Sequence, residues 1–253
     1  MISKNQIKMV KQLEMKKYRQ REGLFVAEGP KVVGDLLATG FEPHTIFATE
    51  EWIQEANKSR GAMKPHLLTL VSSDELRKLS FLQHPQQVLA VFKNSKPNNA
   101  LPSEAVGITL ALDGIQDPGN LGTIIRLADW FDIDSIVCSL DTADAWSPKV
   151  VQASMGSIAR VKICYTDLKE YLSHSKLPIC GTLLDGENIY AQELPHEAIV
   201  VMGNEGNGIS TDIRQLVTHR LLIPQYRPGA ESLNVAIATA VICSEFRRRF
   251  SNY

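Results

Sequence analysis

Residues 198–209, with the sequence AIVVMGNEGNGI, indicate the fold of this chain. The apolar run Ala198 to Met202 predicts a strand buried on both faces, as in a parallel sheet covered by helices on both sides. Glycines follow the run, and they let the backbone come close to a ligand. Ligands of open α/β sheets bind at the carboxyl ends of strands. The stretch therefore predicts a binding site at a strand end, although an ordinary glycine-rich turn would have the same composition.

The spacing of these glycines separates the stretch from the common nucleotide-binding loops. Gly203, Gly206 and Gly208 give the pattern G-x-x-G-x-G, and no Lys-Ser or Lys-Thr pair follows. Both the dinucleotide fingerprint and the phosphate loop are therefore absent. The carboxylate of Glu205 would repel a phosphate, but it could accept a hydrogen bond from a ribose or an amine. These features argue against a nicotinamide-dependent oxidoreductase, which is one alternative for an α/β chain.

The alternation of apolar runs and helical patterns extends over residues 106–253. Strands are predicted at 106–112, 135–138, 160–164, 179–183, 198–202 and 221–223, and helices at 121–131, 149–157, 168–174, 211–218 and 233–250. This order is typical of an α/β sheet with helices on both faces. In the final helix only Thr239 is polar between Val235 and Cys243, so this helix must be buried in a core or against another subunit.

The first part of the chain predicts a smaller α/β domain. Strands are predicted at 24–27, 45–48, 66–71 and 87–92, and helices at 30–39, 50–59 and 73–79. A polar segment with two prolines, residues 93–103, follows without apolar periodicity. We therefore expect a domain at 1–94, a linker at 95–105 and a second domain at 106–253.

The distribution of charge differs between the two parts. The chain has 253 residues and a formal net charge of -1, and its composition is that of a globular protein. Residues 1–100 contain 15 Lys and Arg against 10 Asp and Glu, whereas the rest contains 12 against 18. A basic front part indicates a surface that holds a polyanion through phosphate contacts. The candidate contacts are Lys4, Lys8 and Lys11, which share one helical face, and Arg19; a solvated helix is the simpler alternative.

The cysteines and the start of the chain predict a cytoplasmic protein without a membrane segment. The four cysteines stand singly among apolar residues, and no C-x-x-C pair occurs: Cys138, Cys164, Cys180 and Cys243. They predict reduced core thiols rather than a disulfide frame or a metal site. No apolar run approaches the roughly 18 residues that a membrane span needs. The first residues lead into lysines rather than an apolar stretch, so we expect no signal peptide.

Two further constellations surround the glycine-rich stretch. Asn120 stands where a helix N-cap belongs, and the helix after it places Arg126 roughly opposite its apolar stripe. From periodicity alone, Arg126 is interpreted as an ordinary exposed arginine. The strand that ends at Pro224 is followed by a polar loop and a helix that starts near Ser232. Asn234 would cost about 1–3 kcal/mol if buried without partners, so it should be hydrogen-bonded, either to nearby backbone or in a site.

Together these segments match, in order, the three motifs of the SpoU (TrmH) family of RNA 2'-O-ribose methyltransferases, in the SPOUT superfamily. The matching segments are 120–126 (NLGTIIR), 202–208 (MGNEGNG), and 223–224 (IP) with 232–235 (SLNV). The stretches 25–29 and 88–91 resemble the family's small substrate-binding domain, which is L30e-like. The resemblance implies a parallel sheet with a trefoil knot, S-adenosylmethionine as the cofactor, and a homodimer through the C-terminal domain. It also implies an RNA substrate, ribosomal more than transfer RNA, and no metal.

The resemblance assigns roles to residues of this chain. The positions that match the catalytic set are Asn120, Arg126, Glu205, Ser232 and Asn234, and those that match cofactor contacts are Gly203, Asn204, Gly208, Ile223 and Leu233. Arg126 matches the essential arginine, either as a phosphate-assisted general base or as a phosphate clamp. The loop 225–231 is about one residue longer than in relatives, and Gln86-Gln87 stands where relatives carry Gln-Gly. A transfer RNA methyltransferase and a non-catalytic RNA-binding or ribosome-assembly protein are the alternatives.

Overall fold

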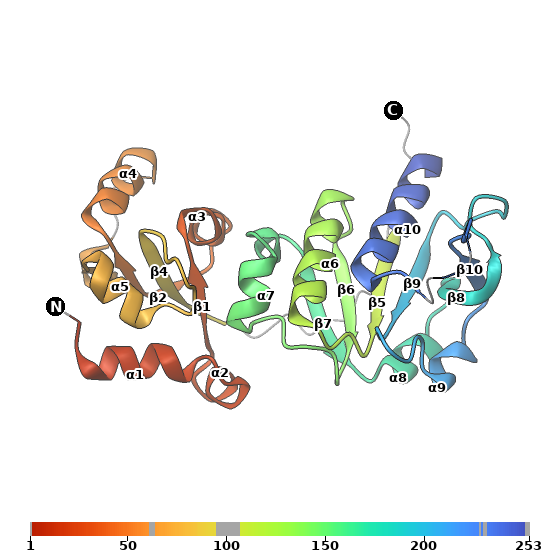
Figure 1. The fold of residues 1–253 in the computed structure, drawn as a ribbon, viewed down its shortest axis with the longest axis horizontal. Helices are drawn as coiled ribbons and strands as arrows, with labels where there is room; N and C mark the ends of the chain where they lie inside the picture. The colour runs from red at the N-terminus through yellow and green to blue at the C-terminus, as the bar shows by residue number, and fades with distance from the viewer. Residues whose placement is uncertain (1, 61–63, 95–106, 228, 230–231, 251–253) are drawn as a thin grey trace. The chain divides into compact units, whose positions relative to one another are not determined.

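The computed structural model describes residues 2–60, 64–94, 107–227, 229 and 232–250 (Figure 1). The chain divides into two compact units, Met1–Lys96 with Asp144–Ala159, and Pro97–Ala143 with Arg160–Tyr253. This division differs from the sequence expectation at one segment. Residues 144–159 lie within the predicted second domain, but they belong to the first compact unit.

The second unit contains the predicted parallel sheet. Its strands are β5 (Ile108–Asp113), β6 (Ser135–Ser139), β7 (Lys162–Thr166), β8 (Ile179–Asn188), β9 (Ala198–Gly203) and β10 (His219–Leu222). Their order is β10-β8-β9-β5-β6-β7, and every neighbouring pair is parallel. All six predicted strands are confirmed, and β8 runs five residues beyond its predicted end. The glycine-rich stretch follows β9, in the middle of the sheet.

Helices cover both faces of this sheet. They are α6 (Pro118–Trp130), α8 (Leu168–Ser173), α9 (Thr211–Arg214) and α10 (Val235–Phe250). Side chains of α8 and α9, among them Leu172 and Ile213, join one core cluster with every second residue of the strands, such as Ile199 and Val201. Helices α6 and α10 pack against each other and against β6 and β9 (Figure 1). The α/β fold that the sequence predicted is therefore confirmed.

The first unit is built on a mixed sheet with the strand order β1-β4-β2-β3. Its strands are β1 (Leu24–Glu28), β2 (Pro43–Ala48), β3 (Leu68–Leu70) and β4 (Val88–Lys93). Its helices are α1 (Lys4–Gln12), α2 (Lys16–Glu22), α3 (Pro30–Ala38), α4 (Glu50–Arg60), η1 (Pro65–Leu67), α5 (Ser73–Leu79), α7 (Pro148–Ala153) and η2 (Ser157–Ala159). Apolar residues of α1 and α5 share a core cluster with β1, β2 and β4. The mixture of helices and strands predicted for the first part of the chain is thus present.

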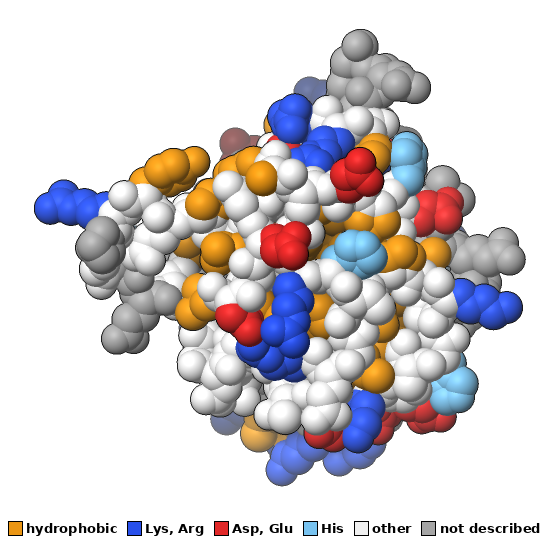
Figure 2. All heavy atoms as spheres, turned by 90° about the vertical axis from the view of Figure 1, so that its right-hand side faces the viewer, with side chains coloured by type: hydrophobic (Ala, Val, Ile, Leu, Met, Phe, Trp, Pro, Cys, Tyr) orange, Lys and Arg blue, Asp and Glu red, His pale blue; other side chains and the backbone are white. Residues whose placement is uncertain are grey.

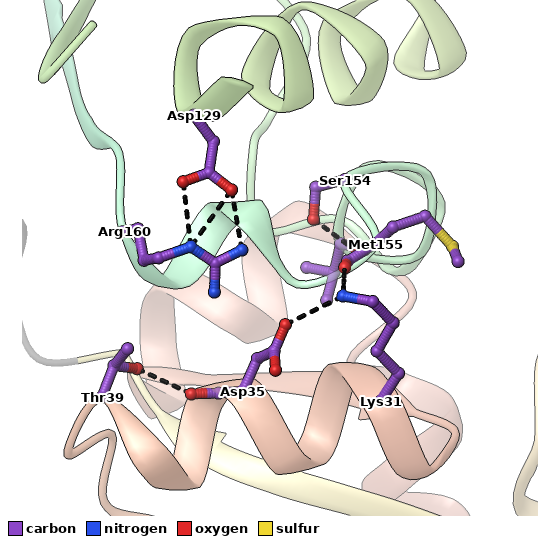
Figure 3. Close-up of polar contacts among 8 residues, drawn as sticks. Lys31, Asp35, Thr39, Asp129, Ser154, Met155 and Arg160 are labelled. Carbon is purple, nitrogen blue, oxygen red and sulfur yellow. Dashed lines mark hydrogen bonds and ion pairs between the residues drawn. The ribbon is translucent and has the colours of Figure 1, made fainter. Parts of the chain in front are cut away.

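The segment 144–159 is part of the core of this first unit. The Trp146 ring lies 4.6 Å from the Phe25 ring, and helix α7 packs against β1. Lys31 of α3 donates to the carbonyl of Met155 at 2.8 Å and pairs with Asp35 at 3.0 Å (Figure 3). Gly156 has φ 94°, a backbone conformation that favours glycine, and the absence of a Cβ lets the Asp35 carboxylate lie against it. Aromatic packing and backbone contacts, rather than sequence order, therefore place this segment in the first unit.

The cysteines lie in the core. All four are buried thiols outside any disulfide, and burial raises the pKa of Cys180 and of Cys243 to about 12. These thiols are therefore protonated near neutral pH. Within the described residues, no helix combines the length and the apolar character that crossing a bilayer demands.

Gln87, at the unusual Gln-Gln pair, adopts a left-handed backbone with φ 43°. A non-glycine residue pays a steric cost there, so we expect Gln87→Gly to raise the free energy of unfolding by about 0.5–1 kcal/mol. Urea denaturation of the full chain measures this. The matched change Gln86→Gly, at a position without a positive φ, should bring no gain. An equal gain in the free energy of unfolding in both variants would show that the positive φ of Gln87 is not the cause.

Glu245 binds two arginines in the last turns of α10. Its side chain is 4% exposed, and it accepts hydrogen bonds from Arg248 and from Arg249, which also donates to the carbonyl of Ile189. The pKa of Glu245 is lowered to about 2. Its hydrogen bonds with Arg248 contribute most and those with Arg249 contribute less, while burial acts in the opposite direction. Because the pKa of Glu245 is lower in the folded chain than in the unfolded one, its ionised form stabilises the fold at any pH above about 4.5, the pKa of the unfolded chain. This stabilisation is lost as the pH falls from about 4.5 toward 2.

We therefore expect Glu245→Gln to lower the free energy of unfolding at pH 7 by about 1–2 kcal/mol. The deficit should shrink as pH falls below about 4.5, because Glu245 then becomes protonated in the unfolded wild-type chain while it is still ionised in the folded one, and this favours unfolding. Urea denaturation at pH 7, 5 and 3.5 follows this difference. A deficit of constant size over the whole range would show that packing, not charge, makes Glu245 important.

Candidate active site

The turn between β5 and α6 positions Asn120, one of the predicted site residues. Asp117, rather than Asn120, caps α6: its carboxylate accepts from the backbone N–H of Asn120 at 2.8 Å, and Pro118 occupies the first helical position. The prediction that Asn120 is the N-cap was therefore wrong, because the helix begins three residues earlier. The side chain of Asn120, one turn into the helix, is thus available for contacts with other segments.

A chain of three polar side chains joins the three sequence segments. Asn234 Nδ2 donates to Asn120 Oδ1 at 2.9 Å, and Asn120 Nδ2 donates to Glu205 Oε1 at 2.9 Å. The backbone N–H of Gln116 lies 3.4 Å from Glu205 Oε2. Residues separated by up to 114 positions in the sequence thus meet at one point, as the resemblance led us to expect. Asn120 uses both ends of its amide, so its orientation is defined from both sides.

Asn204 shapes the glycine-rich loop. Its amide Nδ2 donates to the carbonyl of Gly114 at 2.6 Å, and its Oδ1 accepts from the backbone of Gly206 at 2.9 Å and of Asn207 at 3.1 Å. The backbones of Asn204 and Gly208 also exchange two hydrogen bonds of 2.9 Å. The loop is therefore a closed, hydrogen-bonded turn rather than a loose glycine-rich segment.

Gly203 is where the loop folds back most tightly. A Cβ at this position would lie 2.3 Å from the backbone carbon of Gly208 and 2.3 Å from the nitrogen of Ile209. No rotation of a side chain can relieve a clash with backbone, so this position requires glycine. The sequence analysis placed Gly203 at the ligand, and the structure adds a second reason for glycine here.

Asn234 also begins α10. Its Oδ1 accepts from the backbone N–H of Ala236 at 3.0 Å and of Ile237 at 3.3 Å, as in a helix N-cap. The sequence left two partners open for Asn234, the nearby backbone or other residues of a site. The structure shows both: Oδ1 accepts from the backbone of α10, and Nδ2 donates to Asn120. The side chain therefore fixes the start of α10 relative to the start of α6.

A cavity of about 730 Å³ opens beside this junction. Seven of the predicted site residues line it: Gly203, Asn204, Glu205, Gly208, Ile223, Ser232 and Leu233. Its size is within the usual range for small-molecule sites, about 300–1,000 Å³. Residues 203–208 line one part of it, and apolar residues such as Ile209, Leu222 and Val235 line another part. The cavity thus combines a loop that carries polar backbone groups with apolar side chains.

Sequence reasoning missed the β8 side of the cavity. Residues 182–185 line it, and Asp185 pairs with Arg214 of α9, which also lines it, and with Arg220 at 3.0 Å. Figure 2, which looks onto this end of the unit, shows acidic and basic side chains next to one another among exposed hydrophobic ones. The strand-end rule could have found Asp185, because β8 neighbours β9 and runs parallel to it, but the predicted strand stopped at residue 183.

Arg126 lies apart from the cavity lining. It is exposed on α6, and the described residues offer it no hydrogen bond or ion pair. The structure thus agrees with the exposed position predicted from periodicity. Within one chain it does not bring Arg126 to the cavity.

The four basic residues proposed to contact RNA differ in their surroundings. Lys4 and Lys8 are exposed on α1, whereas Lys11 donates to the carbonyl of Ser80 at 2.5 Å and lies over the Phe81 ring. Arg19 is only 4% exposed, pairs with Asp144 and donates to the carbonyl of Leu13. The prediction for Arg19 was therefore wrong, since buried structural contacts occupy its guanidinium.

Helix α2 carries further exposed cations of the basic front segment. Lys16, Lys17 and Arg21 of α2 are exposed, and the last two lie 5.0 and 4.8 Å from the Tyr18 ring. Among the residues that the structure describes, no group of His, Cys, Asp and Glu side chains is arranged to hold a metal ion.

Two sequence profiles match this chain. Residues 107–244 match the SpoU rRNA Methylase family, and residues 4–90 match the MRM3-like substrate binding domain. The 23S rRNA (guanosine(2553)-2'-O)-methyltransferase RlmP of Bacillus subtilis (strain 168) is 30% identical, over 97% of this chain and 97% of the relative.

Two solved structures resemble the whole chain. A putative RNA methyltransferase of the TrmH family from Porphyromonas gingivalis is 41% identical, with a TM-score of 0.85 over 98% of this chain and 99% of the other. An AdoMet-bound rRNA methyltransferase from Sinorhizobium meliloti is 27% identical, with a TM-score of 0.86 over 100% of this chain and 97% of the other. The similarity therefore covers both units and includes a relative that binds S-adenosylmethionine.

Proposed function

Since this chain belongs to the SpoU rRNA methylase family, we propose that its junction of Asn120, Glu205 and Asn234 serves ribose 2'-O-methylation of ribosomal RNA. The chain is an enzyme of the methyltransferase class and uses S-adenosylmethionine. The observation that carries the assignment of the site is the hydrogen-bonded chain from Asn234 through Asn120 to Glu205 at the edge of the cavity.

The cavity fits S-adenosylmethionine in size and in chemistry. The polar backbone groups of the loop 203–208 suit the polar edge of an adenine, and the apolar side chains suit the faces of the ring. The close approach of Gly203 to the backbone of Gly208 and Ile209 fixes the shape of the loop that lines the cavity. We therefore assign cofactor binding to Gly203, Asn204, Gly208, Ile223 and Leu233. When bound, this cofactor supplies an electrophilic methyl group.

The residues at the junction must then prepare the acceptor. A ribose 2'-hydroxyl is a poor nucleophile at neutral pH, so its proton must be accepted or withdrawn while its oxygen is aligned with the methyl donor. Arg126 is normally protonated, so it acts either as a clamp on the neighbouring phosphate or as a phosphate-assisted base. In this proposal Asn120, Glu205, Asn234 and Ser232 orient the ribose and the loops around it.

Arg126 requires a second copy of the chain to take part, because it lies apart from the cavity of its own chain. The helices that carry the junction leave large apolar side chains in contact with solvent: Trp130 of α6 is 83% exposed, and Ile237 of α10 is 55% exposed. Such exposure on two packed helices supports a homodimer through the C-terminal unit. We also propose that the C-terminal unit contains the trefoil knot that the family resemblance implies.

We expect Ile237→Asp to convert a dimer into a monomer and to lower methylation at least tenfold, because a buried charge at an interface is costly. Light scattering after size-exclusion chromatography measures the mass. The matched change Ser173→Asp, at an exposed position of α8, which packs with α9 rather than with α6 and α10, tests whether any added surface charge has the same effect. A wild-type mass of one chain would refute the dimer.

The first unit is proposed to bind the RNA. Exposed Lys4, Lys8, Lys16 and Lys17 provide positive charge on α1 and α2, and phosphate contacts of this kind weaken as salt rises. The functional domains proposed are 1–94 for RNA binding and 106–253 for catalysis, joined by a linker at 95–105. The buried, reduced thiols support a cytoplasmic location, which is likewise part of this proposal.

The test is to incubate the full chain with S-adenosylmethionine and unmethylated ribosomal or transfer RNA, and to map ribose methyl groups by mass spectrometry. We expect one nucleotide of the ribosomal RNA to gain a methyl group. Methylation of transfer RNA alone would show that the substrate is transfer RNA rather than ribosomal RNA. Binding of RNA without methylation of either would support the non-catalytic alternative.

A further inference from the structure

Two buried hydroxyls lie behind the cofactor cavity, on the opposite side of β5 from the glycine-rich loop. Ser139 ends β6, and Thr142 follows in the turn after it. They are 8% and 2% exposed, and their oxygens are 2.9 Å apart. β5 lies between β6 and β9 in the sheet, so these hydroxyls and the loop meet the end of β5 from opposite sides.

The hydrogen bonds of this pair have a defined direction. The backbone N–H of Gly114 donates to Ser139 Oγ at 2.8 Å, and Thr142 Oγ1 donates to the carbonyl of Leu112 at 3.2 Å. A hydroxyl has a single proton, so Thr142 has none left for Ser139. Ser139 therefore donates to Thr142, and the relay runs from Gly114 through both hydroxyls to Leu112.

This relay fixes a turn that touches the cofactor loop. Gly114 is buried and left-handed, with φ 69°. Its carbonyl accepts the 2.6 Å hydrogen bond from Asn204 Nδ2, and Asn204 Oδ1 in turn holds the backbone of Gly206 and Asn207. One residue, Gly114, thus lies between the hydroxyl pair and the loop: its N–H donates to Ser139 on one side, and its carbonyl accepts from Asn204 on the other.

We propose that Ser139 and Thr142 are positioning residues for the cofactor, which hold the Gly114 turn and, through Asn204, the shape of the loop 203–208. The inference rests on the proposed function, because it takes the cavity to be the cofactor site. Neither hydroxyl lines the cavity, so neither acts by direct contact. The loop keeps a second attachment, from Ser210 N–H to Asp113 Oδ2 at 2.7 Å, so the loss of the relay should weaken binding rather than abolish it.

The test measures S-adenosylmethionine binding to the full chain by isothermal titration calorimetry. Ser139→Ala leaves the buried N–H of Gly114 without its acceptor, and Thr142→Val removes the next link of the relay. We expect each to raise the dissociation constant by about 5- to 50-fold. Thr142→Ser keeps the hydroxyl and should bind like the wild type. A Thr142→Ser variant as weak as Thr142→Val would show that the methyl group, not the relay, matters.

Kinetics separates positioning from general damage. Both relay variants should raise KM for S-adenosylmethionine, while kcat at saturating cofactor stays within about twofold, since neither residue reaches the reacting atoms. The control is Ser154→Ala, which removes another buried serine hydroxyl, bound to the carbonyl of Val151 in the first unit. It should leave the dissociation constant and KM unchanged.

Two failures are distinguishable. If the wild-type chain does not bind S-adenosylmethionine, the proposed function fails and this inference fails with it. If the wild type binds, the inference alone is overturned by wild-type affinity in folded Ser139→Ala and Thr142→Val, or by an equal loss in Ser154→Ala. Circular dichroism of each variant verifies that it is folded.

Discussion

Arg126→Ala is expected to abolish methyl transfer while leaving cofactor binding and folding intact. The side chain is exposed and lies apart from the cavity lining of its own chain, so its removal opens no hole in the core and takes no wall from the cofactor site. Surface changes of this kind alter the free energy of unfolding by about 0.5 kcal/mol or less. If Arg126 clamps the phosphate or assists the base, kcat should fall about 10²- to 10⁴-fold.

Transfer of labelled methyl groups to ribosomal RNA measures the loss, and calorimetry with S-adenosylmethionine measures binding. Arg126→Lys is the informative companion, because lysine keeps the charge but not the planar fork of donors. Recovery of most of the activity by Lys would indicate a charge effect, and failure to recover would indicate bidentate geometry. An Arg126→Ala variant with wild-type kcat would remove this residue from the mechanism.

Gly203→Ala is expected to have the largest effect on cofactor binding. The new Cβ would lie 2.3 Å from backbone atoms of both Gly208 and Ile209, a separation that only movement of the chain can relieve. The loop 204–208 must therefore open, and the cavity wall that it forms must change. We expect the dissociation constant for S-adenosylmethionine to rise at least about 100-fold, which corresponds to roughly 2.7 kcal/mol.

The neighbouring Gly206 provides a matched control. A Cβ there would meet only Asn204 Oδ1, at 3.5 Å, which is ordinary contact. Its backbone N–H, which donates to the same oxygen, is retained in alanine. Gly206→Ala should therefore bind the cofactor within a few-fold of the wild type. Equal losses in the two variants would show that flexibility of the loop, rather than the close approach at Gly203, controls binding.

The segments of the site could be named from the sequence, but the way they are held could not. Asn120 shows the difference. The sequence placed it at a helix cap, since asparagine after a turn commonly has this role, yet Asp117 and Pro118 start the helix earlier. The contact of Asn120 with Glu205 and Asn234 follows from this shift, and depends on residues more than 80 positions away.

The misplaced residues have a common physical cause. Arg19 was counted with the exposed basic residues because its neighbours Lys16, Lys17 and Arg21 are charged, but Asp144 binds it from a distant part of the chain. Charge composition describes a segment as a whole, whereas burial is decided for each side chain by what packs against it. The assignment of residues 144–159 to the first unit depends in the same way on the ring contacts of Trp146.

The sequence by itself determined the order of the elements, the parallel sheet and the three segments proposed for the site. These features are local: an apolar run of a given period becomes a strand or a helix, and a glycine pattern marks a strand end. Only the tertiary structure decided that Ser139 and Thr142 lie behind the cofactor loop, that β8 lines the cavity, and that Arg126 stays outside it. Such contacts join residues that are distant along the chain, and they exist only once the sheet has placed its strand ends side by side.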